Sequence, residues 1–403
     1  MLMLCLLMMG CNPSVESGPY IIPDQNNTEA GDEPDTAKPL AIGDSATFDS
    51  AELNAHDTAT LPPPPPENIT STTSEDIVSV VTVSWTTETD TLGTVEFGTS
   101  SDYEFVTPAT PSGTSHERLL IGIPPDETVH YRVVVTGENG ETASEDHTTS
   151  TGAYPTSLPK FETAGVSKPG FRILPTFGSY NGVLIVNEEG EIVWYYASEG
   201  FPYAVQAQLT SDGQYMVYNS PRIEKGEGEL IWISLNGDTE KQLQIPDIAH
   251  DFVQLPDGTL AVIANDIRDA DGFDANVAGD QVIEITTDGT QTVVWSSWDH
   301  YTPGEHGTVV DGDWTHSNAI DYDPEEDVYY LSILKLGSII KIDRPTGEII
   351  WTLGGDFSDF TTDDEPTALG IHHQFQIQDG VITIFLNGDA TDTEGSQVVH
   401  FEL

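Results

Sequence analysis

Three segments of the sequence begin with a histidine and continue as a short strand. They read HDFVQLPDG from His250, HSNAIDYDP from His316 and HQFQIQDG from His373. In each segment apolar and polar residues alternate up to a turn of Asp, Gly or Pro, and a second strand-like run follows, which is typical of a β-hairpin. The three histidines therefore occupy equivalent positions of a repeated unit. If the units surround an axis, their three imidazoles meet in one pocket.

A second repeated pattern is a turn glycine followed by apolar residues and a tryptophan, which ends at Trp194, Trp295 and Trp351, with a weaker copy at Trp232. The spacing of roughly 40 to 65 residues, without a long helical pattern, matches the blades of a β-propeller. We therefore predict an all-β fold in which the last blade is one strand short. Five units can be counted, beginning near Phe171, Ala204, Ala249, Trp314 and His372.

The charge of the chain excludes several classes of partner. The 403 residues carry 13 Lys plus Arg against 67 Asp plus Glu, a formal net charge of -54. Such an acidic surface repels nucleic acid and anionic membranes, so nucleic-acid binding is not expected. With 37% hydrophobic residues, a chain of this length can bury a large core and hold more than one domain.

The first residues predict export. Residues 1–11 are an apolar run that ends at Gly10 and Cys11, and this run resembles a bacterial lipoprotein signal in which Cys11 is lipidated. The expected location is the outer membrane or cell surface, periplasmic or extracellular, with membrane contact only through the anchor. An ordinary secretory peptide or an incompletely assigned start is the alternative. The run is too short to span a bilayer.

Two segments separate this start from the repeats. Residues 12–67 are rich in Pro, Asp and Thr and end in five consecutive prolines at 62–66, which predicts a disordered tether with a stiff end. Residues 68–152 contain short alternating strands, with Trp85 on an early strand and Tyr131 on a late one. This pattern resembles a fibronectin type III β-sandwich with its tyrosine corner, and we assign it no chemistry.

The predicted propeller, residues 156–403, carries an ordered set of motifs. They are DWTHSNAIDYDP from Asp313, IKIDR from Ile340, GEIIW from Gly347 and LGG from Leu353. With the segments at His250 and His373, they resemble the bacterial arylsulfate sulfotransferases. The resemblance implies a six-bladed propeller that transfers a sulfuryl group from an aryl sulfate to a phenol. Neither a nucleotide sulfate donor nor any other cofactor or metal is implied.

The resemblance also implies a role for each matching residue. His373 would be the nucleophile that is transiently sulfated, while His250 and His316 would hold sulfuryl oxygens and handle protons. A neutral imidazole suits this two-step route, which gives ping-pong kinetics. Where the family carries a sulfuryl-binding arginine, this chain has Lys335, which lacks the planar fork of a guanidinium. Besides Lys335, the residues expected to line the substrate site are Asn318 and His372.

Other interpretations of the same residues stay open. A propeller without the arginine and with an incomplete last blade could bind a small anion or a protein partner without catalysis, and the direction of Lys335 discriminates between the two. Three histidines also suit a zinc site. A loop with four aspartates has the oxygen density that calcium favours, although its spacing does not complete an EF-hand. These aspartates are Asp269, Asp271, Asp274 and Asp280.

Overall fold

The computed structural model describes residues 61–161, 169–176, 178–197, 204–221, 226–238, 240–361, 369–378, 380–387 and 395–402. The signal-like segment with Cys11 and nearly all of the predicted tether lie outside these residues. Most of the regular structure in these residues is β-strand. The helix α1 (Ser297–His300) and the 3-10 turn η2 (Leu334–Leu336) are the helical elements described. No helix in this part of the chain is long and apolar enough to cross a membrane.

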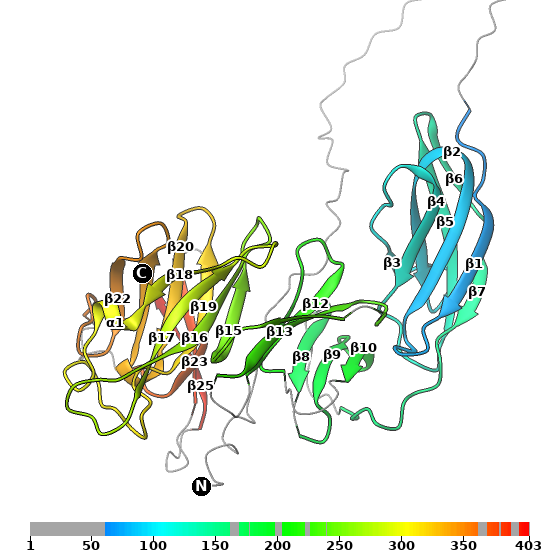
Figure 1. Ribbon diagram of the computed structural model, residues 1–403. Coiled ribbons are helices and arrows are strands. Elements are labelled where there is room, and N and C mark those ends of the chain that lie inside the picture. The colour runs from blue at the N-terminus through cyan, green and yellow to red at the C-terminus, as the bar shows by residue number, and fades with distance from the viewer. Residues whose placement is uncertain are drawn as a thin grey trace, which may run out of the picture.

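A seven-stranded β unit comes first (Figure 1). The long strand β2 pairs with β1 and β4 along its first part and with β3 and β5 along its second, while β6 and β7 extend from β5. Trp85 and Tyr131 are buried in its core, and its fibronectin-like class stays a prediction. The strands are β1 (Glu67–Thr73), β2 (Val81–Gly98), β3 (Phe105–Val106), β4 (Gly113–Leu120), β5 (Thr128–Gly137), β6 (Gly140–Ala143) and β7 (His147–Ser150).

The proline run is not a free spacer along its whole length. Pro66 is buried, and the Thr142 hydroxyl donates to the carbonyl oxygen of Pro63. The end of the predicted tether is therefore packed against the seven-stranded unit.

Five antiparallel sheets follow, each formed by strands consecutive in sequence. They comprise β8 (Arg172–Thr176), β9 (Gly182–Val186) and β10 (Ile192–Ala197); β11 (Ala207–Leu209), β12 (Tyr215–Pro221), β13 (Gly228–Ser234) and β14 (Glu240–Gln244); β15 (Ile248–Gln254), β16 (Leu260–Arg268), β17 (Val277–Ile285) and β18 (Gln291–Ser296); β19 (Ser317–Asp323), β20 (Val328–Ile333), β21 (Ser338–Asp343) and β22 (Ile349–Gly354); and β23 (His372–Gln378), β24 (Val381–Leu386) and β25 (Gln397–Glu402). This is a five-bladed β-propeller arrangement, which confirms the predicted fold class and the three-stranded last sheet.

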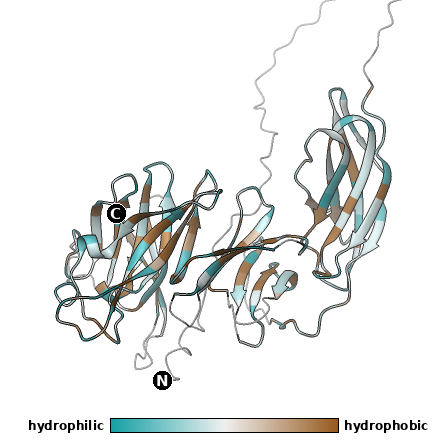
Figure 2. Cartoon of the chain, viewed as in Figure 1, coloured by the Kyte–Doolittle hydropathy of each residue, from teal (hydrophilic) through white to brown (hydrophobic). Residues whose placement is uncertain are grey.

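The sheets stack because their middle strands are apolar on both faces. Every residue of β9 and β20 is buried, and Figure 2 shows hydrophobic residues concentrated on the strands. Separate clusters of buried side chains join the second sheet to the third, the third to the fourth and the fourth to the fifth. Each buried Leu or Ile contributes about 1.5–3 kcal/mol. Among the described residues, none of these clusters joins the fifth sheet to the first.

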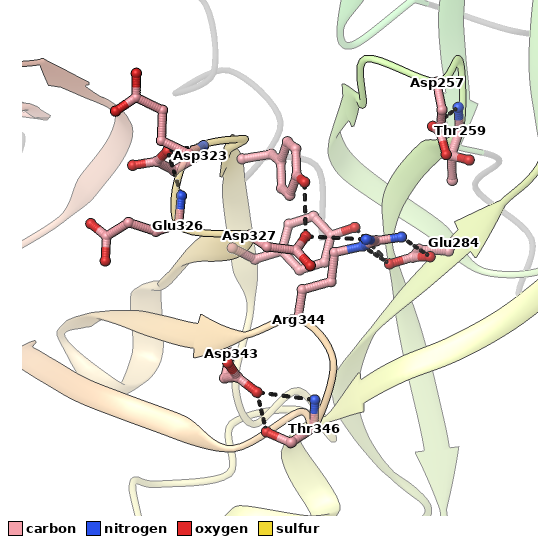
Figure 3. Close-up of polar contacts among 12 residues, drawn as sticks. Asp257, Thr259, Glu284, Asp323, Glu326, Asp327, Asp343, Arg344 and Thr346 are labelled. Atoms are coloured by element: carbon pink, nitrogen blue, oxygen red, sulfur yellow. Dashed lines mark hydrogen bonds and ion pairs between the residues drawn. The ribbon is translucent and has the colours of Figure 1, made fainter.

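An arginine links the third and fourth sheets (Figure 3). Arg344, in the turn after β21, donates two hydrogen bonds to the Glu284 carboxylate on β17, at 2.7 and 3.0 Å, and one to Asp327 at 3.1 Å. The Tyr329 hydroxyl also donates to Glu284. The arginine of the IKIDR motif therefore has a structural role, which is to connect the third and fourth sheets.

The seven-stranded unit is attached to the first two sheets. Ile77 and Val80 lie in the same buried cluster as Trp194 and Met216. The Val78 amide donates to the Tyr195 hydroxyl at 3.0 Å, and the Ser74 hydroxyl donates to the carbonyl oxygen of Asn236. Apolar burial combined with specific hydrogen bonds fixes the orientation of this unit on the propeller.

Candidate active site at the heads of three inner strands

The three predicted site histidines lie at or beside irregularities in the first strands of their sheets. The pairing register shifts between Ile248 and Phe252 around His250, between Ser317 and Ala319 just after His316, and between His373 and Phe375. A β-bulge bends a strand and re-aims its side chains, which is why bulges accompany functional sites. A register shift in or next to the first strand of the sheet is therefore a local feature that all three histidine positions share.

The bulges bring the imidazoles together. The ring centroids of His250 and His316 lie 4.8 Å apart, with 56° between the ring planes. His373 acts electrostatically on His250, and His316 acts on both of the other histidines. The three residues thus form one cluster, although they come from three different sheets.

Burial keeps two of these histidines neutral. Desolvation, reinforced by His316 and His373, lowers the pKa of His250 to about 3, even though Asp313 opposes the shift. Desolvation, reinforced by His316 and His372, lowers the pKa of His373 to about 4. A neutral imidazole has the free electron pair that nucleophilic attack requires.

Buried polar side chains hold the residues next to each histidine. The Asn219 amide donates to the carbonyl oxygen of Ala249, and Asn318 donates to that of His372 at 2.8 Å. The Asp280 carboxylate accepts from the Thr315 hydroxyl and from the Ser317 amide, both at 2.6 Å. The residues next to all three histidines are therefore held by a neighbouring strand or sheet.

Asp251 is the fourth of these buried groups. Its carboxylate accepts from the Ile320 amide at 3.0 Å, from the Gln206 side chain at 3.1 Å and from the Phe252 amide. Desolvation raises its pKa to about 6, although these donors oppose the shift. Asp251 thereby connects three sheets beneath His250.

The side chains of Asn318 and His372 make hydrogen bonds within the protein. The Asn318 side chain is buried, and its oxygen accepts from the Ser332 hydroxyl while its nitrogen donates to His372. His372 is 1% exposed, and its Nδ1 lies 3.2 Å from the carbonyl oxygen of Gly370. These contacts support positioning roles for both residues, and their predicted contact with substrate stays untested.

His373 has one ring nitrogen engaged and one without a partner. Its Nδ1 lies 2.8 Å from the side-chain amide of Asn387, while its Nε2 is buried without a hydrogen-bond partner among the described residues. Asn387 was not predicted as a site residue, although it follows the strand paired with β23. The amide nitrogen of Asn387 faces the ring, an orientation in which Nδ1 accepts the hydrogen bond and Nε2 carries the proton. Turning the amide by 180° brings its oxygen to the ring, which leaves the proton on Nδ1 and a free electron pair on Nε2, the form that nucleophilic attack requires.

Lys335 lies near the histidines but does not point freely into the pocket. In the turn η2, its ammonium lies 2.9 Å from the Asp313 carboxylate and donates to the carbonyl oxygens of Asp313 and Val310. The same carboxylate lies 2.8 Å from Nδ1 of His316. Asp313 begins one of the sequence motifs, but its contacts with His316 and Lys335 were not predicted.

Comparison with known proteins identifies the family. The model of the arylsulfotransferase (ASST) family matches residues 163–400, which include all three histidines. The chain belongs to the arylsulfotransferase family. A search of the curated proteins finds no match.

Solved structures resemble this arylsulfotransferase weakly. A Bacteroides caccae protein of unknown function is 11% identical at a TM-score of 0.39, covering 70% of this chain and 88% of its own. A luciferin-regenerating enzyme is 10% identical at 0.39, covering 68% and 86%. Kuenenia stuttgartiensis hydrazine synthase is 13% identical at 0.32, covering 73% and 80%.

The aspartates proposed for calcium do not act together. Asp280 is buried and turned toward Thr315 and Ser317, so its inclusion in an exposed calcium loop is wrong. Along the described residues of this arylsulfotransferase, no group of three His, Cys, Asp or Glu side chains is arranged to hold a metal ion.

One cavity of the described residues lies away from the histidines. It has a volume of about 520 Å³ between the second and third sheets, and its lining includes Trp232, Asp257 and Asp288. Asp257 follows the end of β15, whereas His250 lies near the start of that strand. None of the three imidazoles lines this cavity, so it is separate from the histidine cluster.

Proposed function

We propose that the chain transfers a sulfuryl group from an aryl sulfate to a phenol through a sulfohistidine at His373. Membership of the arylsulfotransferase family supports sulfuryl transfer, with aryl sulfates and phenols as the substrate classes. The observation that carries the choice of nucleophile is the unpartnered Nε2 of His373, on a ring whose pKa is lowered to about 4. That ring is unprotonated at neutral pH.

The first step forms a nitrogen–sulfur bond. The electron pair on Nε2 of His373 attacks sulfur, the bond from sulfur to the aryl oxygen breaks, and its electrons stay on the departing phenolate. His316 supplies a proton to that oxygen. Its Nδ1 lies 2.8 Å from the Asp313 carboxylate, which orients the ring, whereas desolvation lowers the pKa of His250 to about 3, so we assign this role to His316 in preference to His250.

The second step reverses the first with a different phenol. The acceptor oxygen attacks sulfur, its proton passes to His316, and the electrons of the nitrogen–sulfur bond return to His373. Sulfuryl oxygens gain charge in both steps, and by analogy with phosphoryl transfer most of the catalysis comes from positioning and stabilising that charge. His250, next to His316, is placed to contact these oxygens.

The experiment that tests this function is incubation with 4-nitrophenyl sulfate, with and without phenol as acceptor. Release of 4-nitrophenol that depends on phenol supports transfer. Release at the same rate without an acceptor indicates hydrolysis, and absence of release from folded protein removes the proposal.

A second candidate function is binding without catalysis, and one observation favours it. The Lys335 ammonium is paired with Asp313, so the site holds no described cation free of a carboxylate partner beside the histidines. In that case the pocket binds a small anion or a group on a protein partner. Tight binding of an aryl sulfate that is recovered unchanged after long incubation distinguishes this function from transfer.

We also propose that the protein is exported and anchored by a lipid on Cys11. The proposal rests on the apolar residues 1–11 and the tether-like composition that follows. Expression in a bacterial host with labelled palmitate tests it, because the Cys11→Ser variant should lose the label. Equal labelling of both proteins contradicts the anchor.

A further inference from the structure

One carboxylate contacts two basic side chains beside the histidine cluster. Asp313 Oδ2 lies 2.8 Å from Nδ1 of His316 and 2.9 Å from Nζ of Lys335. Burial alone would raise the pKa of Asp313, but His316 and Lys335 together hold it below its ordinary value. Asp313 is therefore an anion built into the site.

The backbone keeps Asp313 in this position. Asp313 and Val310 exchange backbone hydrogen bonds in both directions at 3.0 Å, and the next residue, Trp314, is fully buried. His316 has a φ of 56°, in the left-handed region that costs a non-glycine residue about 1 kcal/mol or more. Its carbonyl oxygen accepts from the Leu334 amide, which helps to hold this conformation.

The donors of Lys335 are already used. An ammonium has three N–H groups, and this one has three acceptors, the Asp313 carboxylate, the Asp313 carbonyl oxygen and the Val310 carbonyl oxygen at 3.4 Å. Binding a sulfuryl group would require at least one of these contacts to break. The contacts connect Lys335 to the segment that carries Asp313.

We propose that Asp313 is the positioning residue of His316, and that Lys335 serves to hold Asp313 in place instead of binding the sulfuryl group. The inference rests on the proposed function for its effect on rate. A carboxylate against Nδ1 keeps the Nδ1–H tautomer, so Nε2 of His316 faces the reacting atoms and transfers the proton. Asp313 contacts His316 and affects proton transfer through that residue.

The other charged groups around His316 do not replace Asp313. His250 and His373 act electrostatically with His316 from the third and fifth sheets, and both have lowered pKa values that keep them neutral. Lys335 is a donor and cannot accept a hydrogen bond from the His316 ring. Asp313 is thus the carboxylate in contact with the His316 ring among the described neighbours.

The kinetic test compares Asp313→Asn with aryl sulfates whose phenols differ in pKa. General acid catalysis contributes about 10²–10⁴-fold, so we expect kcat to fall about 100-fold for donors with poorly leaving phenols. The fall should be much smaller for 4-nitrophenyl sulfate, and KM should change little. Asp311→Asn is the matched control, because Asp311 is exposed nearby and should give wild-type values. An equal loss for every donor would overturn the role in proton transfer.

Lys335→Met tests the second half of the proposal. If Lys335 acts through Asp313, this variant shows the same dependence on the leaving phenol, and the double variant with Asp313→Asn is hardly slower than Asp313→Asn alone. If Lys335 binds the sulfuryl group, its loss weakens inhibition by inorganic sulfate, raises KM for all donors equally and adds to the loss at Asp313. That result would overturn the assignment.

A readout without turnover separates this inference from the proposed function. In protein labelled with ¹⁵N-histidine, the neutral His316 ring should carry its proton on Nδ1, and the Asp313→Ala variant should shift the proton to Nε2. His316→Gln assigns the signal. An unchanged tautomer contradicts the positioning role even in an inactive protein, whereas the expected change together with no transfer removes only the proposed function.

Discussion

The imidazoles of His250 and His316 lie 4.8 Å apart, and each comes from the first strand, or the residue just before it, of a different sheet. Two protonated rings at this distance would repel each other, so only one of them can carry a charge at moderate cost. His316 has the Asp313 carboxylate beside it, and His250 is desolvated. The two rings therefore differ in their surroundings: His316 contacts a carboxylate, and burial keeps His250 neutral.

The activity should persist far into the acidic range. Because desolvation lowers the pKa of His373 to about 4, the nucleophile is deprotonated above that pH and becomes protonated only below it. We expect the acid limb of kcat/KM to bend near pH 4, measured with 4-nitrophenyl sulfate over the range in which the protein stays folded. A bend near 6.5, the value of an unperturbed histidine, would contradict the neutral nucleophile.

Salt should accelerate capture of the substrate. The net charge of -54 repels an anionic aryl sulfate at long range, and salt screens this repulsion. We expect kcat/KM to rise between low and moderate salt while kcat stays constant, in steady-state assays with sodium chloride. A monotonic fall indicates that local attraction in the pocket dominates capture.

Asn318→Asp should slow the reaction and destabilise the fifth sheet. The substitution places a carboxylate oxygen against the carbonyl oxygen of His372, so a buried hydrogen bond becomes a repulsion. The free energy of unfolding should fall by about 1–3 kcal/mol, and kcat should fall without movement of the acid limb. Urea unfolding and the donor assay measure the two effects.

The matched control for that variant is Asn181→Asp. The Asn181 side-chain oxygen accepts from the Gly178 amide, and an aspartate can accept there equally well. Its stability and rate should match the wild type. Equal effects at both positions would show that added negative charge, not the lost donor, is responsible.

Arg344→Met should loosen the contact between the third and fourth sheets. It removes two hydrogen bonds to Glu284, a carboxylate that is only 13% exposed, and leaves that charge without its partner. A loss of about 2 kcal/mol is expected from urea unfolding. Arg268→Met removes a pair that is 47% exposed on the arginine side and should cost less. A larger loss at Arg268 contradicts the role of Arg344.

The sequence was sufficient to predict the sheets and the clustering of the three histidines, because both follow from short-range patterns that repeat. The His-headed segments predicted the positions of His250, His316 and His373 in their sheets. The bulges that aim these side chains have no comparable local signal, since a register shift depends on the partner strand.

The supporting residues could not be predicted for a different reason. Asp280 was grouped with exposed aspartates because its burial depends on Thr315 and Ser317, which lie in the next sheet. Asp313 lies at the end of an irregular segment, where no repeat indicates which side chains it meets. The proposed role of Lys335 depends on its contact with Asp313. Without that contact, the sequence suggested only that Lys335 stands in for the sulfuryl-binding arginine of the family.

The most direct test of the central claim is the mass of the protein trapped during turnover. After incubation with 4-nitrophenyl sulfate and quenching at alkaline pH, we predict a sulfuryl-sized mass increase on the peptide that contains His373. The increase should disappear on addition of phenol and be absent from His373→Asn, while His130→Asn, in the seven-stranded unit, should behave as the wild type. Phenol-dependent transfer without an adduct on that peptide, or release of 4-nitrophenol by His373→Asn, would contradict the account.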